Sequence, residues 1–406
     1  MFVESNLTGY NAHALDLARA RGLGTSFAAR DPQEYVGMRP DVLALADEVA
    51  VVDTFDLGKL LHHAASVRAR AVVAVDDYRL VSAAAAACAL GLPHADVAGL
   101  VNAHFKDRTR ALCDGIGRRV NHVVIDRDTQ LSSSPLPYPC VIKPLDDSGS
   151  TGVTVCADDR DWARALERAR EVRQNLRGYV CTGGLLVEEY VEGVEFTAEC
   201  MWDNTRHGWQ LLGYTRKLLG PPPAPVETGA MFPHWFEPAL DARVEQTVYA
   251  WLEAVGHRYG SAHVEFKICG DGATDRDIAL IEINPRLGGD QIRDLIRITG
   301  GVDPIELYLD LALGNPVEVK RVMTRNAVAT SFYKLPPALG RVISVVAPEI
   351  PMPGVVRHSL MVGEMTIDGV RDNDDRLGYV ICVASDAEKS LAIAQEFMEN
   401  VTVEYA

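Results

Sequence analysis

The first 95 residues alternate short apolar runs with segments in which apolar positions recur at helical spacing. The apolar runs predict buried strands and lie at residues 2–3, 48–52 and 70–75. The segments of helical spacing lie at residues 12–21, 57–68 and 82–90. Strands that alternate with helices indicate a parallel, Rossmann-like sheet. We therefore expect an α/β fold that begins with a Rossmann-like domain over residues 1–95.

Polar residues follow two of these predicted strands. Ser5 and Asn6 come after the first strand, and Asp76 and Asp77 come after the third. Parallel sheets bind ligands in the loops beyond the carboxyl ends of their strands, so these four are candidate site residues. Turn and helix-cap chemistry explains the same residue types without a ligand. No GxGxxG follows the first strand, and we therefore infer no NAD or FAD.

From residue 96 the pattern changes to longer strands joined by hairpins. Strands are predicted at residues 139–143, 153–157, 185–190, 196–202, 210–217, 264–269 and 278–283. Helices are predicted at residues 102–116, 161–177 and 244–259, and a proline-rich loop at residues 220–233. A final α+β unit has a helix at 386–400 between strands at 379–384 and 401–405. We expect domain boundaries that give two middle subdomains, at 96–182 and 183–330, and a C-terminal subdomain at 331–406.

Composition narrows the class of protein. Hydrophobic residues make up 48% of the chain and charged residues 24%, which is typical of globular domains. The formal net charge of −16 disfavours nucleic acid and anionic membranes as partners. No apolar run approaches the ~20 residues that span a bilayer, and no signal-peptide pattern is present. We expect a soluble, cytoplasmic protein whose eight cysteines are free thiols, with a zinc site or disulfides as the alternative.

A loop rich in glycine, serine and threonine follows one predicted strand. Lys143 ends that strand, the loop DSGSTG covers residues 147–152, and another strand begins at once. A P-loop would need GxxxxGK[ST] followed by a helix, so a hairpin is expected instead. The tip of such a hairpin can bind phosphates through backbone N–H groups, and Lys106 and Lys143 can neutralise phosphate charge. The alternative is an ordinary turn beside two solvated lysines.

A second segment, residues 185–196, has the pattern of an acidic hairpin. Its first strand reaches Glu188, Glu189 and Val191, and the second begins at Glu195. Exposed backbone groups at such an apolar edge can pair with an adenine, and a carboxylate can accept ribose hydroxyls. A solvent-exposed acidic hairpin explains the pattern equally well.

A third segment combines oxygen-bearing side chains on two neighbouring strands. Residues two apart in a strand share a face, so Glu282 and Asn284 point the same way and Glu265 joins them from the paired strand. Two carboxylates and an amide oxygen suit Mg²⁺, which also takes phosphate oxygens as ligands. Arg286 then follows the strand, where it can meet a developing phosphoryl charge. A salt-bridged hairpin face is the alternative, although the sequence shows no matching run of cations.

In this order, the segments resemble those of the ATP-grasp superfamily. The resemblance covers about residues 1–330 and rests on Lys106, VIKP (141–144), SGSTGV (148–153), EEYVEGVEF (188–196), HVEFK (263–267) and EINPR (282–286). It implies that the cofactors are ATP and Mg²⁺ or Mn²⁺, with metal ligands Glu265, Glu282 and Asn284. It implies catalytic roles for Lys143 and Arg286. The nucleotide contacts that it implies are Lys106, Lys143, Ser148, Gly149, Ser150, Thr151, Gly152, Glu188, Glu189, Val191 and Glu195.

Within the superfamily the chain is most similar to bacterial carboxylate–amine ligases that join L-amino acids. The similarity lies in NPRLGGDQI (284–292) and VETGAMFP (226–233), although Ala230 stands where such ligases often have histidine. It implies that a small carboxylate is activated as an acyl phosphate and transferred to an amine, with release of ADP and phosphate. The candidate substrate residues are Asp76, Asp77, Trp235, His263, Arg286, Gly288 and Gly289. Oligomeric state stays open, with a homodimer as one option.

Two other functions fit the same motifs. One is a carboxylase or a purine-pathway enzyme of the same superfamily, although no AMKM biotin-carrier segment is present. The other is a nucleotide-binding module without catalysis. The retention of Glu265, Glu282, Asn284 and Arg286 favours an enzyme, because a module without catalysis would not need them.

Overall fold

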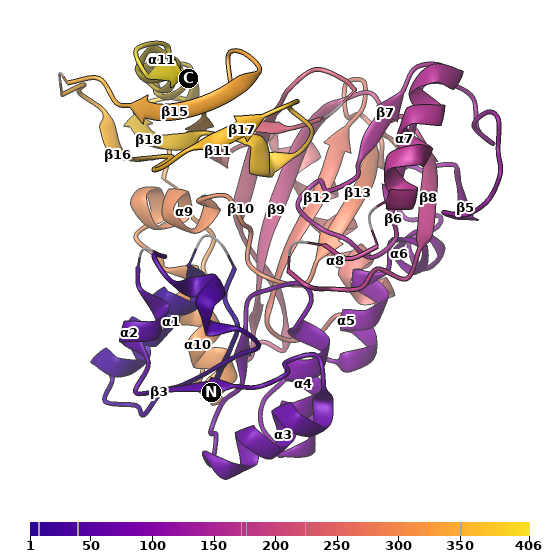
Figure 1. Ribbon diagram of the computed structural model, residues 1–406. Coiled ribbons are helices and arrows are strands. Elements are labelled where there is room, and N and C mark those ends of the chain that lie inside the picture. Colours follow the sequence, from indigo (N-terminus) through magenta and orange to yellow (C-terminus); the bar gives the residue numbers. More distant parts are fainter. Residues whose placement is uncertain are drawn as a thin grey trace.

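A computed structural model describes residues 1–6, 9–38, 40–171, 173–175, 177–223, 225–322, 324–349 and 351–406. The N-terminal unit is a four-stranded parallel sheet in the order β3-β2-β1-β4, which confirms the predicted α/β class (Figure 1). Its strands are β1 (Phe2–Val3), β2 (Ser26–Ala29), β3 (Glu48–Val51) and β4 (Val73–Ala74). Its helices are α1 (Tyr10–Ala20), α2 (Val42–Leu45), α3 (Leu57–Ser66) and α4 (Leu80–Ala89). The sequence did not predict β2, because SFAA is short and lacks the β-branched residues that favour strands.

A small antiparallel sheet lies beside the main body and has the order β5-β8-β6-β7. Its strands are β5 (His122–Asp126), β6 (Cys140–Pro144), β7 (Thr154–Cys156) and β8 (Gly184–Glu189). Helix α7 (Asp159–Glu171) covers one face, where Trp162 and Leu166 pack against Cys140 and Ile142. Helix α7 ends at Glu171, before the end at residue 177 that the sequence predicted. Residues 172 and 176 of that prediction lie outside the described residues.

The helix predicted at 102–116 is wrong, because the chain forms two helices there. They are α5 (Val97–His104) and α6 (Lys106–Leu112). Phe105 between them has extended backbone angles (φ −89°, ψ 111°), and the Lys106 backbone N–H donates to the Leu145 carbonyl at 3.0 Å. The break lets α6 turn Lys106 and Arg110 inward, where both side chains are buried.

The large sheet has eight strands, paired antiparallel, in the order β13-β12-β9-β10-β11-β14-β18-β16. They are β9 (Val194–Asp203), β10 (Gly208–Leu219), β11 (Glu227–His234), β12 (Ser261–Ile268), β13 (Ile278–Asn284), β14 (Val328–Tyr333), β16 (Val355–Leu360) and β18 (Gly378–Ala384). The loop predicted at 220–233 is wrong over its second half, because β11 occupies it from Glu227 onward. A strand forms there because β10 and β14 supply hydrogen-bond partners on both sides.

Helices cover this sheet and join it to the other units. They are α8 (Pro238–Ala254), α9 (Ile292–Gly300) and α10 (Pro304–Leu313). Helix α10 packs against the N-terminal unit, where Leu309 and Leu311 share a core with Leu15 of α1. Helix α8 begins before the predicted residue 244, because Pro238 occupies its first turn.

The C-terminal residues extend the large sheet and add a small one. The small sheet has the order β17-β15-β19, with β15 (Gly340–Val346), β17 (Met365–Ile367) and β19 (Thr402–Tyr405). Helix α11 (Ala387–Glu399) packs on the large sheet, which confirms the helix predicted at 386–400. Among the described residues, no helix combines the length and apolar character needed to cross a bilayer. Because β14, β16 and β18 belong to the large sheet, the last 75 or so residues are built into the same body as the central strands.

Candidate active site

A cavity of about 1080 Å³ lies where all of these units meet. Its walls come from the loops of the N-terminal sheet, from β6 and β8 of the small sheet, and from β12 and β13 of the large sheet. The loop before β18 closes one side with Asp372, Asp374 and Arg376. This volume is at the upper end of ordinary ligand sites, so it can accept more than one small molecule.

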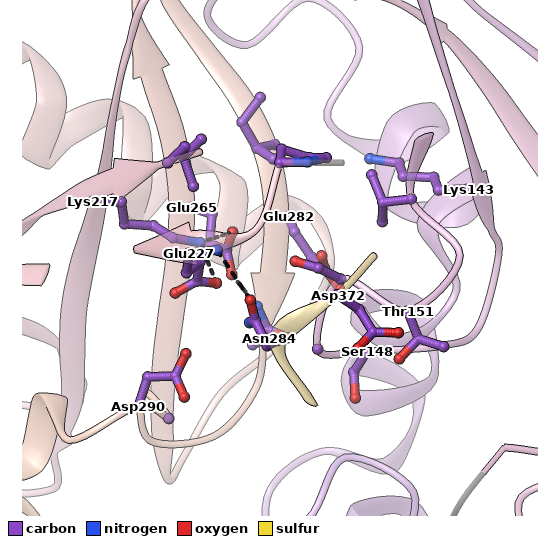
Figure 2. A pocket seen from close by; sticks show the side chains of 18 of the residues that line it. Lys143, Ser148, Thr151, Lys217, Glu227, Glu265, Glu282, Asn284, Asp290 and Asp372 are labelled. Carbon is purple, nitrogen blue, oxygen red and sulfur yellow. Dashed lines mark hydrogen bonds and ion pairs between the residues drawn. The ribbon is translucent and has the colours of Figure 1, made fainter. Parts of the chain in front are cut away.

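The oxygen-bearing face predicted on two strands is present. Glu265 of β12 lies directly opposite Glu282 of β13, and His263 lies opposite Asn284. The Asn284 amide donates to Glu265 at 3.2 Å, and these side chains face the cavity (Figure 2). The pairing of these strands therefore brings the predicted metal ligands together.

The prediction that this face lacks matching cations is wrong. The Lys106 ammonium lies 3.0 Å from Glu282, and the Lys217 ammonium lies 2.9 Å from Glu265. These lysines come from α6 and β10, so the sequence places them far from the carboxylates that they meet. Burial would lower the pKa of Lys106, but Glu282, with Asp147 and Asp77, outweighs burial and raises the pKa, so Lys106 stays charged.

The donor chemistry of this face fits a hard divalent cation. Glu265, Glu282 and the Asn284 amide offer carboxylate and amide oxygens toward one cavity, and the Glu282 side chain keeps 23% of its surface exposed. Within the described part of the chain, no three His, Cys, Asp or Glu side chains form a metal-binding group by themselves. A metal held here would therefore depend on the amide and on phosphate oxygens as well as on the two carboxylates.

Lys217 is the most heavily paired cation of the cavity, and the sequence gave no sign of it. Its ammonium lies 3.2 Å from Glu195, 3.0 Å from Glu227 and 2.9 Å from Glu265. Burial would lower its pKa, but these three carboxylates outweigh burial and raise it. One buried charge thus connects the predicted ribose carboxylate with a predicted metal ligand.

At the other end of the cavity, Glu188 lies between two cations. Its carboxylate is 2.7 Å from the Lys143 ammonium and accepts a hydrogen bond from Arg110 on its other oxygen. Burial alone would raise the pKa of Glu188, but Arg110 and Lys143 outweigh it and lower the pKa to about 2. Burial lowers the pKa of Lys143. Arg110 also donates to the Leu280 carbonyl at 2.7 Å, so it ties the small sheet to β13.

The remaining predicted nucleotide residues lie on or near the same wall. Glu189, Val191 and Glu195 line the cavity, and the Lys267 ammonium donates to the Val191 carbonyl at 3.2 Å. Val191 therefore has a backbone oxygen already engaged by Lys267.

The glycine-rich loop borders the cavity through Ser148, Gly149, Ser150 and Thr151. The Tyr78 hydroxyl hydrogen-bonds the Ser148 hydroxyl at 2.9 Å, so the N-terminal unit holds the base of the loop. Gly152 is not on the cavity wall, and a Cβ there would come within 3.2 Å of the Pro144 ring. Lys106 lies beneath the loop, beside a small separate cavity.

Arg286 and the N-terminal acidic residues lie together in the structure. The Arg286 Nε donates to Asp77 at 2.7 Å, and burial is outweighed by Asp77, which raises the Arg286 pKa. Asp76 pairs with Arg79 at 3.2 Å and with Arg177 at 3.4 Å. Asn6 lines the cavity, whereas Ser5 is buried beside it and accepts a hydrogen bond from Arg177 through its carbonyl at 2.6 Å.

His263 lies on the wall between two carboxylates. Its Nδ1 is 2.9 Å from Glu199 and its Nε2 is 3.4 Å from Glu265. Burial would lower its pKa, but the carboxylates, Glu199 foremost, outweigh burial and raise it to about 10. Gly288 supports this pair, because a Cβ there would lie 2.8 Å from His263 Nδ1. Gly289 lines the cavity directly.

Trp235 is not brought to the cavity. It follows the end of β11, and its ring lies 5.9 Å from the Arg325 guanidinium. Trp235 was a candidate substrate residue, and it lies just beyond the segment 226–234, which was predicted to be mostly loop. Because most of that segment is a strand, Trp235 falls beyond the cavity wall.

Comparison with known proteins identifies the two parts of the chain. Residues 136–294 match the model described as the ATP-grasp domain. The chain contains an ATP-grasp domain over these residues. Residues 335–406 match the model described as L-amino acid ligase C-terminal domain 2. The second match covers the residues that close one side of the cavity.

Two curated proteins are similar to parts of the chain. The uncharacterized protein y4rH of Sinorhizobium fredii is 29% identical over 276 residues, which are 68% of this chain and 55% of that protein. Carnosine synthase 1 of Mus musculus is 30% identical over 188 residues, which are 44% of this chain and 21% of that protein. The chain thus spans about half of the first relative and about a fifth of the second.

Among solved structures, L-amino acid ligase from Bacillus licheniformis has the same fold. The TM-score is 0.78 at 18% identity, with 100% of this chain and 98% of that chain covered. At this identity the likeness establishes the architecture, from the N-terminal sheet to the C-terminal unit.

Proposed function

We propose that this protein is an ATP-dependent carboxylate–amine ligase that forms an amide through an acyl phosphate and releases ADP and phosphate. The observation that supports this most strongly is the shared cavity. It joins the Lys143–Glu188 end, the oxygen-bearing face of Glu265, Glu282 and Asn284, and the Arg286–Asp77 pair. Cations for phosphates, ligands for a metal and a guanidinium near the N-terminal loops are what such a reaction requires.

The nucleotide would lie along the small sheet, with its phosphates toward the glycine-rich loop. Lys143, held by Glu188 at 2.7 Å, presents a fixed charge to the phosphates. Glu195 would accept ribose hydroxyls beside Lys217 and Lys267. Magnesium bound by Glu265, Glu282 and Asn284 would neutralise charge on the terminal phosphates.

The carboxylate substrate would lie between the phosphates and the Arg286 guanidinium. Arg286 is buried and aligned by Asp77, so it can stabilise charge on the transferring phosphoryl group without reorganising. A substrate carboxylate oxygen attacks the terminal phosphorus, and ADP leaves with the bonding electron pair. The glycine-rich loop, held at its base by Tyr78, would then shield the acyl phosphate from water.

An amine completes the reaction at the acyl carbon. Its nitrogen forms the new bond, phosphate leaves with the electron pair of the broken C–O bond, and the nitrogen releases a proton. The amine and the carboxylate are small molecules under this proposal, because they must share the cavity with the nucleotide.

A ligase is favoured over the carboxylase and purine-pathway alternatives by the C-terminal unit. Solved phosphoribosylglycinamide synthetase and biotin carboxylase structures share the fold at 13% and 15% identity, which shows architecture alone. The match of residues 335–406 to L-amino acid ligase C-terminal domain 2 favours an amino acid as one substrate.

The test is a phosphate-release screen with ATP, magnesium and pairs of carboxylates and amines, followed by mass spectrometry. Release that requires both partners, with a product of their summed mass less water, supports the proposal. Release with bicarbonate alone would replace it with a carboxylase.

The paired variants are Glu282→Ala and Asp275→Ala. Loss of Glu282 should lower substrate-dependent ADP formation by more than about 100-fold, in line with removal of a transition-state electrostatic contact. Asp275 is exposed in the turn between β12 and β13, so its substitution should leave ADP formation unchanged. ADP formation that survives in Glu282→Ala would contradict the ligase proposal.

A further inference from the structure

The turn between β13 and α9 has an unusual backbone. It includes Arg286 and Gly289 on the cavity wall, and it ends with Asp290 and Gln291 at φ angles of +49° and +70°. The left-handed region is unfavourable for a residue with a β-carbon, because the β-carbon then crowds the backbone carbonyl oxygen. Two such residues in succession persist only where the surroundings hold them.

A side chain from the C-terminal unit holds this turn. Arg376 donates to both carboxylate oxygens of Asp290, at 2.9 Å and 2.8 Å. Its guanidinium lies over the Tyr333 ring at 4.0 Å, and its Nε donates to the Asn373 carbonyl at 2.8 Å. The Arg376 side chain is only 12% exposed, and its contacts with Tyr333 and Asn373 fix its position independently of Asp290. A bidentate pair of this kind fixes geometry as well as contributing energy.

Other contacts fix the backbone on either side of Asp290. The Tyr333 hydroxyl donates to the Asp290 carbonyl at 2.8 Å, and Arg357 donates to the Gln291 side chain at 3.0 Å. The Tyr10 hydroxyl donates to the Gly288 carbonyl at 2.5 Å. The turn is therefore held from the N-terminal unit and from the C-terminal unit at once.

We propose that Arg376 is a positioning residue for the substrate end of the cavity. Through Asp290, Arg376 holds the turn at residues 288–291 in its left-handed conformation. The turn then fixes Arg286 and Gly289 against the carboxylate substrate. This rests on the proposed ligase function for its catalytic consequence. It assigns the loop before β18 a part in the chemistry, because Arg376 of that loop makes the bidentate pair with Asp290.

The first experiment compares Arg376→Ala with Arg371→Ala in the full chain. Displacing Arg286 by about 1 Å should cost about 100-fold in kcat/KM for the carboxylate substrate. The Kd for Mg-ATP should stay within about twofold, because the Lys143 end is untouched. Arg371 lies on the same loop, but its guanidinium pairs with the exposed Asp368, so Arg371→Ala should match the wild type. Equal loss of ATP affinity and of kcat/KM in Arg376→Ala would overturn the proposal.

The second experiment separates backbone positioning from direct substrate contact. In an Arg376→Ala background, Asp290→Gly and Asp290→Ala both remove the unpaired carboxylate, yet only glycine adopts a φ of +49° without strain. Positioning predicts that the glycine variant recovers about tenfold of the lost kcat/KM and the alanine variant does not. Equal activity of the two double variants would overturn it.

Amide hydrogen exchange of residues 286–295 tests the same claim without catalysis. Exchange there should accelerate in Arg376→Ala and slow again in the double variant with glycine. Unchanged exchange overturns the positioning role even if the wild type forms amides. If exchange accelerates in Arg376→Ala but the wild type forms no amide product, the positioning role stands and the ligase proposal fails.

Discussion

Glu188 should make the stability of this protein depend on pH in a defined way. Its carboxylate is buried between Arg110 and Lys143, and its pKa falls from an ordinary 4.5 to about 2. Because the folded pKa is the lower one, the stabilisation is fully present above about pH 4.5 and is lost as the pH falls toward 2. At about 1.4 kcal/mol per unit of pKa, the contribution at neutral pH is about 3 kcal/mol.

The perturbation is Glu188→Gln, which keeps the shape and removes the charge. Two buried cations then lose their carboxylate, a change that typically costs about 3–5 kcal/mol. Urea denaturation followed by tryptophan fluorescence should therefore show a loss of about 3 kcal/mol at neutral pH. The difference in the free energy of unfolding between this variant and the wild type should shrink by about 1.4 kcal/mol per pH unit below the pKa of the free carboxyl.

The matched control is Glu192→Gln, on the exposed turn that follows β8. It should unfold as the wild type does at every pH, because surface charges contribute little. A Glu188→Gln variant within about 0.5 kcal/mol of the wild type at neutral pH would refute the electrostatic argument. A gap that stayed constant down to about pH 3 would also refute it, because the loss would then come from packing and not from charge.

Two further predictions concern the walls of the cavity. Gly288→Ala should lower substrate-dependent ADP formation at least about tenfold, because its Cβ would lie 2.8 Å from the His263 ring and displace it. Gly208→Ala, at the start of β10 and away from the cavity wall, is the matched control, with no atom within 4 Å of the new Cβ, and a similar loss there would contradict the steric explanation. Trp235→Ala should leave kcat and KM unchanged in the same assay, because its ring contacts Arg325 away from the cavity. A raised KM in Trp235→Ala would contradict this prediction and indicate that Trp235 contributes to substrate binding.

The elements that the sequence predicted best are those whose signal is local. The hairpin of β12 and β13 follows from alternation, and that alternation places Glu265 beside Glu282. The parallel N-terminal sheet follows from strands that alternate with helices, so Asp76 and Asp77 reach the cavity as expected. Each of these inferences needs only neighbours along the chain.

The missed elements depend on partners far away in the sequence. Residues 227–234 contain a proline and a glycine and follow a run of prolines, as a loop would, yet they form β11 because β10 and β14 border them. The separation of α5 from α6 at Phe105 likewise depends on the Leu145 carbonyl, which accepts from the Lys106 backbone. Local propensity is a weak guide where tertiary hydrogen bonds are available.

By itself, the sequence determined that Glu282 and Asn284 share one face of a strand, because side-chain periodicity fixes which residues of a strand point the same way. Only the tertiary structure decided how those groups are charged and held. Lys106, Arg110, Lys217 and Arg376 reach their carboxylates from separate elements, and the sequence shows no link between them. The physical reason is that electrostatic pairing depends on distance in space and on burial, and chain separation records neither.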